Sequence, residues 1–552
     1  SVNKDKHSEY HTSPTPKYRR LIFMIIDAFR ADFAFGPLNF FPKTQRILSQ
    51  GNGLQFTAEV HPPTVTLPRI KAITTGSTPS FVDVVLNFGA SSLDEDNIIA
   101  QMKMDGRKII FFGDDTWLRL FPGYFDRSDG TTSFFVSDYK EVDINVTRHL
   151  GPELSNPNWD VMILHYLGLD HIGHISGPSS PLIRPKLAEM DSVVEQIYAT
   201  MNQWNEPSLL VICGDHGMSD QGGHGGASAG EISVPVLFLS PQIKNKDPRH
   251  AGVISQVDLC PTISVLMGLP IPKNNIGKVV TETLFGFSIS QKVSIMHRNA
   301  KQAIQVLKSY LKDLDKDSAY ILYKKAKEQH QDWLLVKNST AQDSWEELGN
   351  SLLVLYSESL SLLAKKVESV ATQYDVYSMA IAMVLLWMLL VTFVLSQMKR
   401  SPNLVSVSLS THMTRLSITS GTALLTHITM CTGGVPSDLM CSSSFLSIGV
   451  QLTVAAIFAT CSLYLLKEWQ RCLTLFSQIK VWRRKTSLLE IFLAAGTVTH
   501  TFTLLSSSFV EEEHQTYYFL TTTVHLLCMM WLVIHILGLG HGSQLGSTGS
   551  TK

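Results

Sequence analysis

The sequence predicts an α/β domain with a largely parallel central sheet, followed by a helical linker and a multi-span α-helical membrane domain. Three observations predict this order: short apolar runs in the first 240 residues, helix-length stretches between them, and long apolar stretches beyond residue 376. Runs that are apolar on both faces and alternate with helices are typical of a buried parallel sheet. Because such sheets carry their sites at the carboxyl ends of the strands, functional residues are expected among the polar residues that follow each run.

The α/β domain is assigned to residues 1–290. An amphipathic helix is predicted over 182–204, where apolar residues recur at helical spacing. The composition then becomes helical and charged over 293–328 and 344–372, which assigns 291–373 to the helical linker. The predicted strands cover 21–26, 108–112, 161–165, 209–213 and 234–239.

The membrane domain is assigned to residues 374–540, with a polar tail over 541–552. A membrane-spanning helix needs roughly 20 apolar residues, so the second of the five candidates is marginal in length. The candidate spans are 376–395, 416–430, 445–466, 488–508 and 517–537.

The charges between these spans predict the topology. Lys399 and Arg400 follow the first span, and the connection between the third and fourth spans holds six further basic residues. The other two connections carry acidic residues and no Lys or Arg, so the positive-inside rule places the large domain on the lumenal side. The sequons at Asn145 and Asn338 agree with this side and predict N-glycosylation there.

Charge and cysteine content exclude some classes of protein. The 46 basic and 47 acidic residues nearly balance, which gives no electrostatic reason to expect a nucleic-acid partner. Only Cys213 and Cys260 precede the apolar region, so a disulfide framework is not predicted. The chain opens with Ser1 and a polar stretch instead of a signal peptide or anchor, and we expect a fragment or a processed form.

Acidic residues and histidines follow three of the predicted strands. Any one Asp at a strand end is more often a turn former, and a lone His beside glycines is usually a loop residue. Three such segments together favour a metal site, because carboxylate and imidazole are the ligands that zinc and similar divalent ions take. Asp170 and His174 are four residues apart and share a helix face. The full set is Asp27, Asp170, His174, Asp215, His216 and His224.

The segment HPPTVTLPRIKAITTG offers a nucleophile. Thr64 and Thr66 both precede Pro68 and a stretch compatible with a helix. A Thr near a helix start is normally an N-cap, yet the same position presents backbone amides to an anion. Thr66 is the preferred nucleophile, since a neighbouring metal would lower the pKa of its hydroxyl.

These residues resemble those of the alkaline phosphatase superfamily, especially its phosphodiesterase-like branch. The longer segments PPTVTLPRIKAITTGSTPSFVDV, LHYLGLDHIGHISGP and CGDHGMS resemble the GPI ethanolamine phosphate transferases, and most closely those that modify the second mannose. The resemblance is strongest over residues 20–290. It implies an alkaline-phosphatase-like fold for the catalytic domain.

The resemblance also implies two divalent metal ions, Zn²⁺ or Mn²⁺, and their ligands. One ion would take Asp170, His174 and His224. The other would take Asp27, Asp215, His216 and the Thr66 oxygen. Thr66 would accept phosphoethanolamine from phosphatidylethanolamine, and a mannose of the GPI precursor would then displace it. The implied setting is the endoplasmic reticulum membrane, with the catalytic domain in the lumen, membrane lipid around it and a stabilising membrane subunit beside it.

For several other residues the sequence allows both a functional and a purely structural interpretation. Arg69 and Lys71 either hold phosphate oxygens or are exposed helix charges. Asp114 and Asp115 form a turn, or one of them orients a ligand or meets the ethanolamine ammonium. His171 is adjacent to a predicted ligand and is a candidate to support it. Glu511–Glu513 and His514 either recognise a lipid head group or form a solvated acidic loop.

Two other functions share the same residues. A membrane-tethered metal-dependent phosphodiesterase or phosphatase would use water in place of the mannose hydroxyl. A non-catalytic subunit would keep the fold and lose a ligand or the nucleophile, and none is lost here. A multi-span membrane domain favours the transferase, because a lipid donor and a lipid-linked acceptor both lie in a membrane.

Overall fold

The computed structural model describes two compact units of the chain. The described residues up to 371 belong to the first unit, and those from 376 onward belong to the second. The residues described are 16–37, 40–78, 92–132, 137–245, 247, 252–310, 314–335, 342–371, 376–397, 427, 429, 431, 451–462 and 465.

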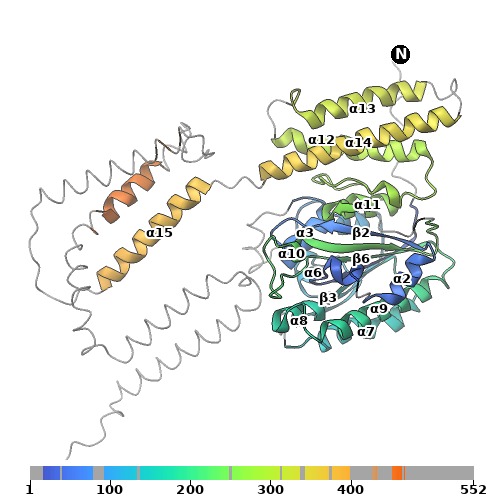
Figure 1. The fold of residues 1–552 in the computed structure, drawn as a ribbon, viewed down its shortest axis with the longest axis horizontal. Helices are drawn as coiled ribbons and strands as arrows, with labels where there is room; N and C mark the ends of the chain where they lie inside the picture. Colours follow the sequence, from blue (N-terminus) through green and yellow to red (C-terminus); the bar gives the residue numbers. More distant parts are fainter. Residues whose placement is uncertain are drawn as a thin grey trace, which may run out of the picture. The chain divides into compact units, whose positions relative to one another are not determined.

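An eight-stranded sheet forms the centre of the first unit (Figure 1). Its order is β4-β3-β5-β1-β6-β7-β2-β8, and five of the seven strand pairs are parallel. The expected α/β domain with a mostly parallel sheet is therefore confirmed. The strands are β1 (Arg20–Ile26), β2 (Gly53–Glu59), β3 (Ile109–Asp114), β4 (Arg127–Thr131), β5 (Val161–Tyr166), β6 (Ser208–Gly214), β7 (Ser233–Leu239) and β8 (Val253–Ser255).

Five strands match the predicted runs, namely β1, β3, β5, β6 and β7. The sequence did not predict β2, β4 and β8, because β2 alternates between buried and partly exposed positions, β4 is polar and β8 has three residues. Strand β7 runs antiparallel to both of its neighbours. Its connection from β6, residues 215–232, contains only the four-residue helix α10 (Ala229–Ile232) and not the longer helix that usually joins two parallel strands.

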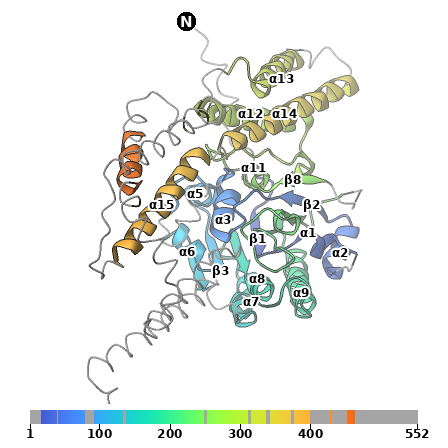
Figure 2. The same ribbon diagram turned by 60° about the vertical axis from the view of Figure 1, so that its left-hand side comes forward.

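Alternate residues of the central strand β1 enter two different cores. Leu21, Phe23 and Ile25 belong to one apolar cluster, and Ile22, Met24 and Ile26 belong to the other, because successive side chains of a strand point to opposite faces. Helices cover both faces, with α7 and α9 on one side of the sheet and α11 on the other in both views (Figure 1, Figure 2). On the first side lie α2 (Pro42–Ser49), α7 (Glu141–Leu154) and α9 (Ile183–Met201); on the second lie α3 (Thr66–Thr75), α5 (Ile98–Met104) and α11 (Leu259–Leu266).

Three long helices occupy the region predicted as a helical linker. They are α12 (Ile289–Tyr310), α13 (Ser318–Leu335) and α14 (Gln342–Ala371). Their buried residues, among them Val293, Trp333 and Tyr356, join the same apolar cluster as α3 and α11. These helices therefore share a core with the sheet. The remaining short elements are α1 (Ala31–Phe35), α6 (Thr116–Leu120), α8 (Gly168–Ser176) and the 3₁₀ turns η3 (Gln256–Asp258) and η4 (Thr281–Thr283).

The second unit contains α15 (Val376–Gln397), which begins where the first predicted span begins. Within the part of the chain that the structure describes, no helix combines the length and the apolar character needed to cross a membrane. The predicted spans 488–508 and 517–537 and most of 416–430 lie outside the described residues, and so do residues 445–450, 463, 464 and 466 of the span 445–466. So do the polar tail, Asn338, Glu511–Glu513 and His514.

A buried histidine pair joins α12, α13 and α14, and it predicts a loss of stability in acid. His297 Nδ1 lies 2.9 Å from the Tyr356 hydroxyl, and His330 Nδ1 lies 3.1 Å from it. Burial, followed by the charge of His330, lowers the pKa of His297 from its ordinary 6.5 to about 4. Since the folded pKa lies below the unfolded one, the stabilisation is complete above pH 6.5 and is lost as the pH falls towards 4.

We expect the free energy of opening of α12–α14 to be about 2 kcal/mol lower at pH 5 than at pH 8. Hydrogen exchange of the backbone amides of these helices, followed against pH, measures it. The variant His297→Gln keeps a hydrogen-bonding group beside Tyr356 but does not titrate, so its pH dependence should be flatter. Equal pH slopes in the variant and the wild type would assign the effect to other groups.

Candidate metal and phosphoryl-transfer site

Three neighbouring parallel strands bring the predicted ligands together. Strand β1 lies between β5 and β6, and its last residue pairs with the last residue of each of them. Asp27 follows β1, Asp215 and His216 follow β6, and α8 begins just after β5. Because the carboxyl ends of parallel strands meet at one edge, these side chains converge there.

The first ligand group contains Asp170, His174 and His224. Asp170 and His174 lie one helical turn apart on α8, with 3.4 Å between Oδ2 and Nε2. His224 comes from the loop between β6 and α10, and its Nε2 lies 3.8 Å from Asp170 Oδ1. The three side chains can direct ligand atoms at one common point.

The second ligand group contains Asp27, Asp215 and His216. His216 Nε2 lies 3.5 Å from Asp27 Oδ1 and 3.4 Å from Asp215 Oδ2. All three residues are buried. The rings of His216 and His224 stack with centroids 4.1 Å apart, so the second group lies next to the first. The two groups contain the same carboxylates and imidazoles that the resemblance divided between two ions, and the Thr66 oxygen implied for the second ion is considered below.

Backbone carbonyls determine which histidine nitrogens face the site. His216 Nδ1 lies 2.9 Å from Gly217 O, and His224 Nδ1 lies 2.8 Å from Thr64 O. A carbonyl oxygen only accepts, so each Nδ1 carries the proton and donates it. Each Nε2 then presents its lone pair to the site, which is the arrangement of a metal-binding histidine.

The residues present fit two divalent cations. Asp170 Oδ1 and Asp215 Oδ2 are buried and accept no hydrogen bond from the described residues. Buried carboxylate oxygens without a partner are costly, and a bound cation would satisfy them. Two ligand atoms on one tetrahedral zinc lie about 3.3 Å apart, close to the 3.4 Å seen within each group.

Electrostatics keep the ligands in their metal-binding protonation states. Burial lowers the pKa of His216 to about 4, although the nearby Asp215 charge acts in the opposite direction, so its imidazole is neutral at pH 7. Burial alone would raise the pKa of Asp170, but His174 and His224 outweigh it and hold the pKa well below its usual range. A neutral His216 imidazole and an ionised Asp170 carboxylate are each in the state that a zinc ligand requires.

The hydroxyls of the two candidate nucleophiles, Thr64 and Thr66, have different surroundings in the structure. Thr66 is the first residue of α3, and its Oγ1 lies 3.4 Å from both Asp27 Oδ2 and His216 Nε2. Thr64 Oγ1 instead accepts a hydrogen bond from Gly225 N and donates one to Gly226 O. Thr64 therefore holds the loop that carries His224, and Thr66 alone places its hydroxyl beside the second ligand group.

His165 contacts Asp27 and is itself held by Trp117, and the sequence did not predict either contact. The Trp117 indole Nε1 can only donate, and it lies 2.9 Å from His165 Nδ1. In the neutral ring the proton is therefore on Nε2, which lies 3.3 Å from Asp27 Oδ2. His165 faces the site because it is the next-to-last residue of β5, but within a wholly buried strand nothing in the sequence distinguishes it from a core histidine.

The other predicted residues lie in different surroundings. Lys71 forms an ion pair with Glu95 at 2.7 Å, and Asp115 forms one with Arg119 at 2.9 Å. His171 is buried, and its Nδ1 lies 2.8 Å from Asp138 O.

Asp114 and Arg69 are both buried. Asp114 accepts a hydrogen bond from Thr116 N, and burial raises its pKa to about 6. The interpretation of Arg69 as an exposed helix charge is wrong, because this residue is 1% exposed. Its guanidinium donates hydrogen bonds to Gln256 Oε1 and His61 O. Burial lowers the pKa of Arg69 to about 10, so the group remains charged at neutral pH.

A buried ion pair positions the start of α8. Asp143 Oδ1 accepts hydrogen bonds from Leu167 N and Gly168 N, each at 3.0 Å, and Asp143 Oδ2 accepts one from Lys186 at 2.8 Å. A Cβ atom at Gly168 would lie 2.4 Å from Asp143 Oδ2, so the position requires glycine. This contact determines where α8 begins, and hence where Asp170 lies.

The chain is similar to known proteins over nearly its whole length. A family model described as "Sulfatase" matches residues 185–269. The human "GPI ethanolamine phosphate transferase 2, catalytic subunit" is 38% identical over 533 residues, which cover 94% of this chain and 54% of that protein. "GPI ethanolamine phosphate transferase 2" from Aspergillus fumigatus is 47% identical over 318 residues, which cover 54% of this chain and 42% of that protein.

Among solved structures, a protein in the alkaline phosphatase superfamily from Vibrio parahaemolyticus aligns with a TM-score of 0.38 and 20% identity. The alignment covers 49% of this chain and 71% of that one. The present chain spans about half the length of the curated relatives that it matches. Over 94% of its length the chain is therefore similar to GPI ethanolamine phosphate transferases 2, and residues 185–269 match the sulfatase family.

Proposed function

We propose that this chain transfers phosphoethanolamine from a phosphatidylethanolamine donor to a mannose of the GPI precursor, the second mannose by its likeness to the type 2 transferases. The observation that carries the proposal is the position of Thr66. Its hydroxyl lies beside the second of two adjacent ligand groups, at the start of a helix. A nucleophile so placed suits a double displacement at phosphorus.

In the first half-reaction the Thr66 oxygen attacks the phosphorus of the donor phosphodiester. The bond from phosphorus to the diacylglycerol oxygen breaks, and diacylglycerol leaves with a proton. Asp27 and His216 contact the Thr66 hydroxyl and orient it for this attack. The first-turn amides of α3 have no acceptors within the helix, so those of Thr66 and Leu67 are suited to a phosphate oxygen.

In the second half-reaction a mannose hydroxyl attacks the same phosphorus. The bond to the Thr66 oxygen breaks, the threonine regains its proton and phosphoethanolamine remains on the sugar. Donor and acceptor use the site in turn, which is why a covalent intermediate helps. Two divalent ions, Zn²⁺ or Mn²⁺, held by the two ligand groups would stabilise the charge on the transferring phosphoryl oxygens.

The proposal extends to the setting of the enzyme. It places the chain in the endoplasmic reticulum membrane, with residues 1–290 in the lumen, where Asn145 would be glycosylated. Asn145 is partly exposed on α7, in keeping with this. The human relative is named a catalytic subunit, which supports a partner subunit in the membrane.

The test uses the full chain in detergent with zinc and phosphatidylethanolamine labelled in its phosphoethanolamine group. We expect label to enter the protein, and to pass to a mannose-containing GPI glycolipid when that acceptor is added. Analysis of the labelled products separates the two enzymatic functions. Release of free phosphoethanolamine at the same rate with and without acceptor would assign the chain to the hydrolases. No label on protein or product would contradict both.

A further inference from the structure

A buried glutamine, Gln256, links two elements of the site. Its Oε1 accepts hydrogen bonds from Arg69 Nε at 2.9 Å and Arg69 Nη2 at 2.5 Å. Its Nε2 donates to Gly214 O at 2.9 Å and to Asp215 O. Gln256 is fully buried, so no water competes for these four bonds.

The two ends of this link carry different parts of the candidate site. Arg69 lies one turn after Thr66 on α3, so a shift of the guanidinium would move the helix that presents the nucleophile. Gly214 ends β6, and Asp215 belongs to the second ligand group. Gln256 therefore joins the nucleophile helix to the strand end that carries Asp215 and His216.

We propose that Gln256 is a positioning residue that holds the Thr66 oxygen at its working distance from His216 in the second ligand group. This inference rests on the proposed function of Thr66. The role requires one acceptor and two donors on a single small group, and a glutamine amide supplies all three. A glutamate would satisfy the charge of Arg69 but would turn a carboxylate oxygen towards two carbonyl oxygens.

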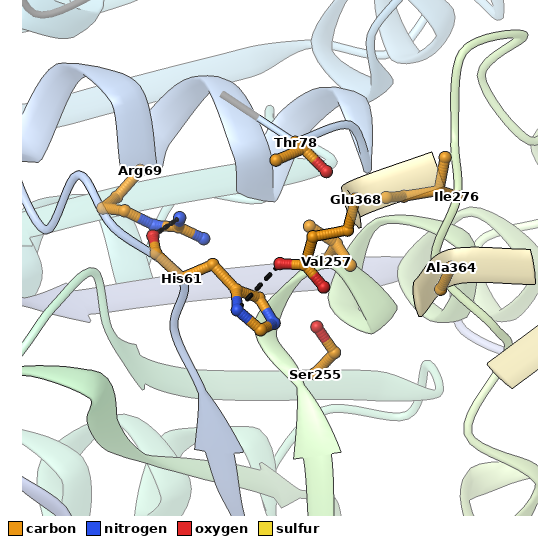
Figure 3. Close-up of a pocket in the computed structure, with 8 residues that line it drawn as sticks. All are labelled: His61, Arg69, Thr78, Ser255, Val257, Ile276, Ala364 and Glu368. Atoms are coloured by element: carbon orange, nitrogen blue, oxygen red, sulfur yellow. Dashed lines mark hydrogen bonds and ion pairs between the residues drawn. The ribbon is translucent and has the colours of Figure 1, made fainter. Parts of the chain in front are cut away.

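Arg69 is also linked to helix α14, through His61. Arg69 Nη1 donates to His61 O at 2.7 Å, and His61 Nδ1 forms an ion pair with Glu368 Oε1 at 2.8 Å. Figure 3 shows His61 and Glu368 pointing toward each other, with Arg69 beside His61. His61, Arg69 and Glu368 line a small pocket. Ser255 and Val257, which precede and follow Gln256 in the sequence, line the same pocket.

The His61–Glu368 pair is much more exposed than the link through Gln256, with 41% of the His61 side chain accessible. An exposed ion pair contributes little, so the positioning should depend on the buried bonds. The variant Glu368→Gln is therefore a control within the same network, and we expect it to label at close to the wild-type rate.

The experiment compares Gln256→Glu and Gln256→Met with Gln302→Glu in the full chain. Gln302 is a matched control, because its Nε2 also donates to two backbone carbonyls, Lys273 O and Asn275 O, both at 2.8 Å. We expect each Gln256 variant to lower the rate of Thr66 labelling about 100-fold, the usual cost of a misplacement of about 1 Å. The KM for the donor lipid and a zinc content of about two per chain should remain.

A second measurement does not depend on activity. In metal-free protein, hydrogen exchange of the α3 amides should become about tenfold faster in Gln256→Met and remain unchanged in Gln302→Glu. If exchange accelerates but labelling keeps the wild-type rate, Gln256 supports the helix without positioning Thr66, and the inference is wrong. Loss of zinc in step with the rate would also overturn it. A wild type that never labels would contradict the proposed function, while the exchange result would still report on the link.

Discussion

Replacing Thr66 with alanine should lower label uptake from phosphatidylethanolamine by more than about 10³-fold, while the metal content remains close to that of the wild type. The variant removes the only threonine hydroxyl among the described residues that lies beside both Asp27 and His216. It leaves all six carboxylate and imidazole ligands in place. Mass spectrometry of the labelled peptide, with zinc measured on the same sample, checks both expectations.

Two other threonine variants make this test specific. Thr66→Ser keeps a hydroxyl at the same position and should retain part of the labelling. Thr64→Ser keeps the hydrogen bonds that Thr64 Oγ1 makes to Gly225 and Gly226, so it should label close to the wild-type rate. Label found on any residue other than Thr66 in the wild type would show that the nucleophile is misassigned.

Replacing Asp170 with asparagine should reduce the zinc content from about two ions per chain to about one, and transfer by about 10²-fold or more. Asp170 supplies the only carboxylate of the first ligand group, whose other members are His174 and His224. The pKa of Asp170 lies far below its usual range, so the wild-type ligand is an anion at every working pH. A neutral amide loses that charge and with it most of the affinity for a divalent ion.

Asp191→Asn is the matched control for this variant. Asp191 is also buried, and it accepts hydrogen bonds from Lys43 N and Thr44 N, at 2.9 Å each, away from both ligand groups. Its loss should lower the thermal stability and leave the zinc content at about two. If Asp170→Asn retained two ions, the first group would not be a metal site.

Local sequence patterns were sufficient to predict the three strands that carry the candidate site and the six ligands that follow them. Strands β1, β5 and β6 are continuous apolar runs because both faces are buried, and each ends at a change to Gly, Asp or His that is visible in the sequence. The six ligands follow from these ends, since parallel neighbours bring them to one edge. The grouping of the six into two sets of three came from the family resemblance, and the structure brings the same sets together.

Contacts between distant segments could not be predicted in this way. The choice between Thr64 and Thr66 depends on the loop around Gly225, which lies far along the chain. The antiparallel direction of β7 is defined only by its pairing with β2 and β6. His165 and Gln256 look like ordinary core and loop residues until Trp117 and Arg69 are placed against them.

Sequence pattern and tertiary structure thus account for different parts of this protein. The residue types, their order and their place after buried strands are local properties, because burial and backbone preference act within a few residues. Which oxygen faces a ligand group, which nitrogen carries a proton and which arginine is buried are set by partners up to 187 residues apart, as between Arg69 and Gln256. Packing alone brings such groups within hydrogen-bonding distance, and a hydrogen bond acts only at that range.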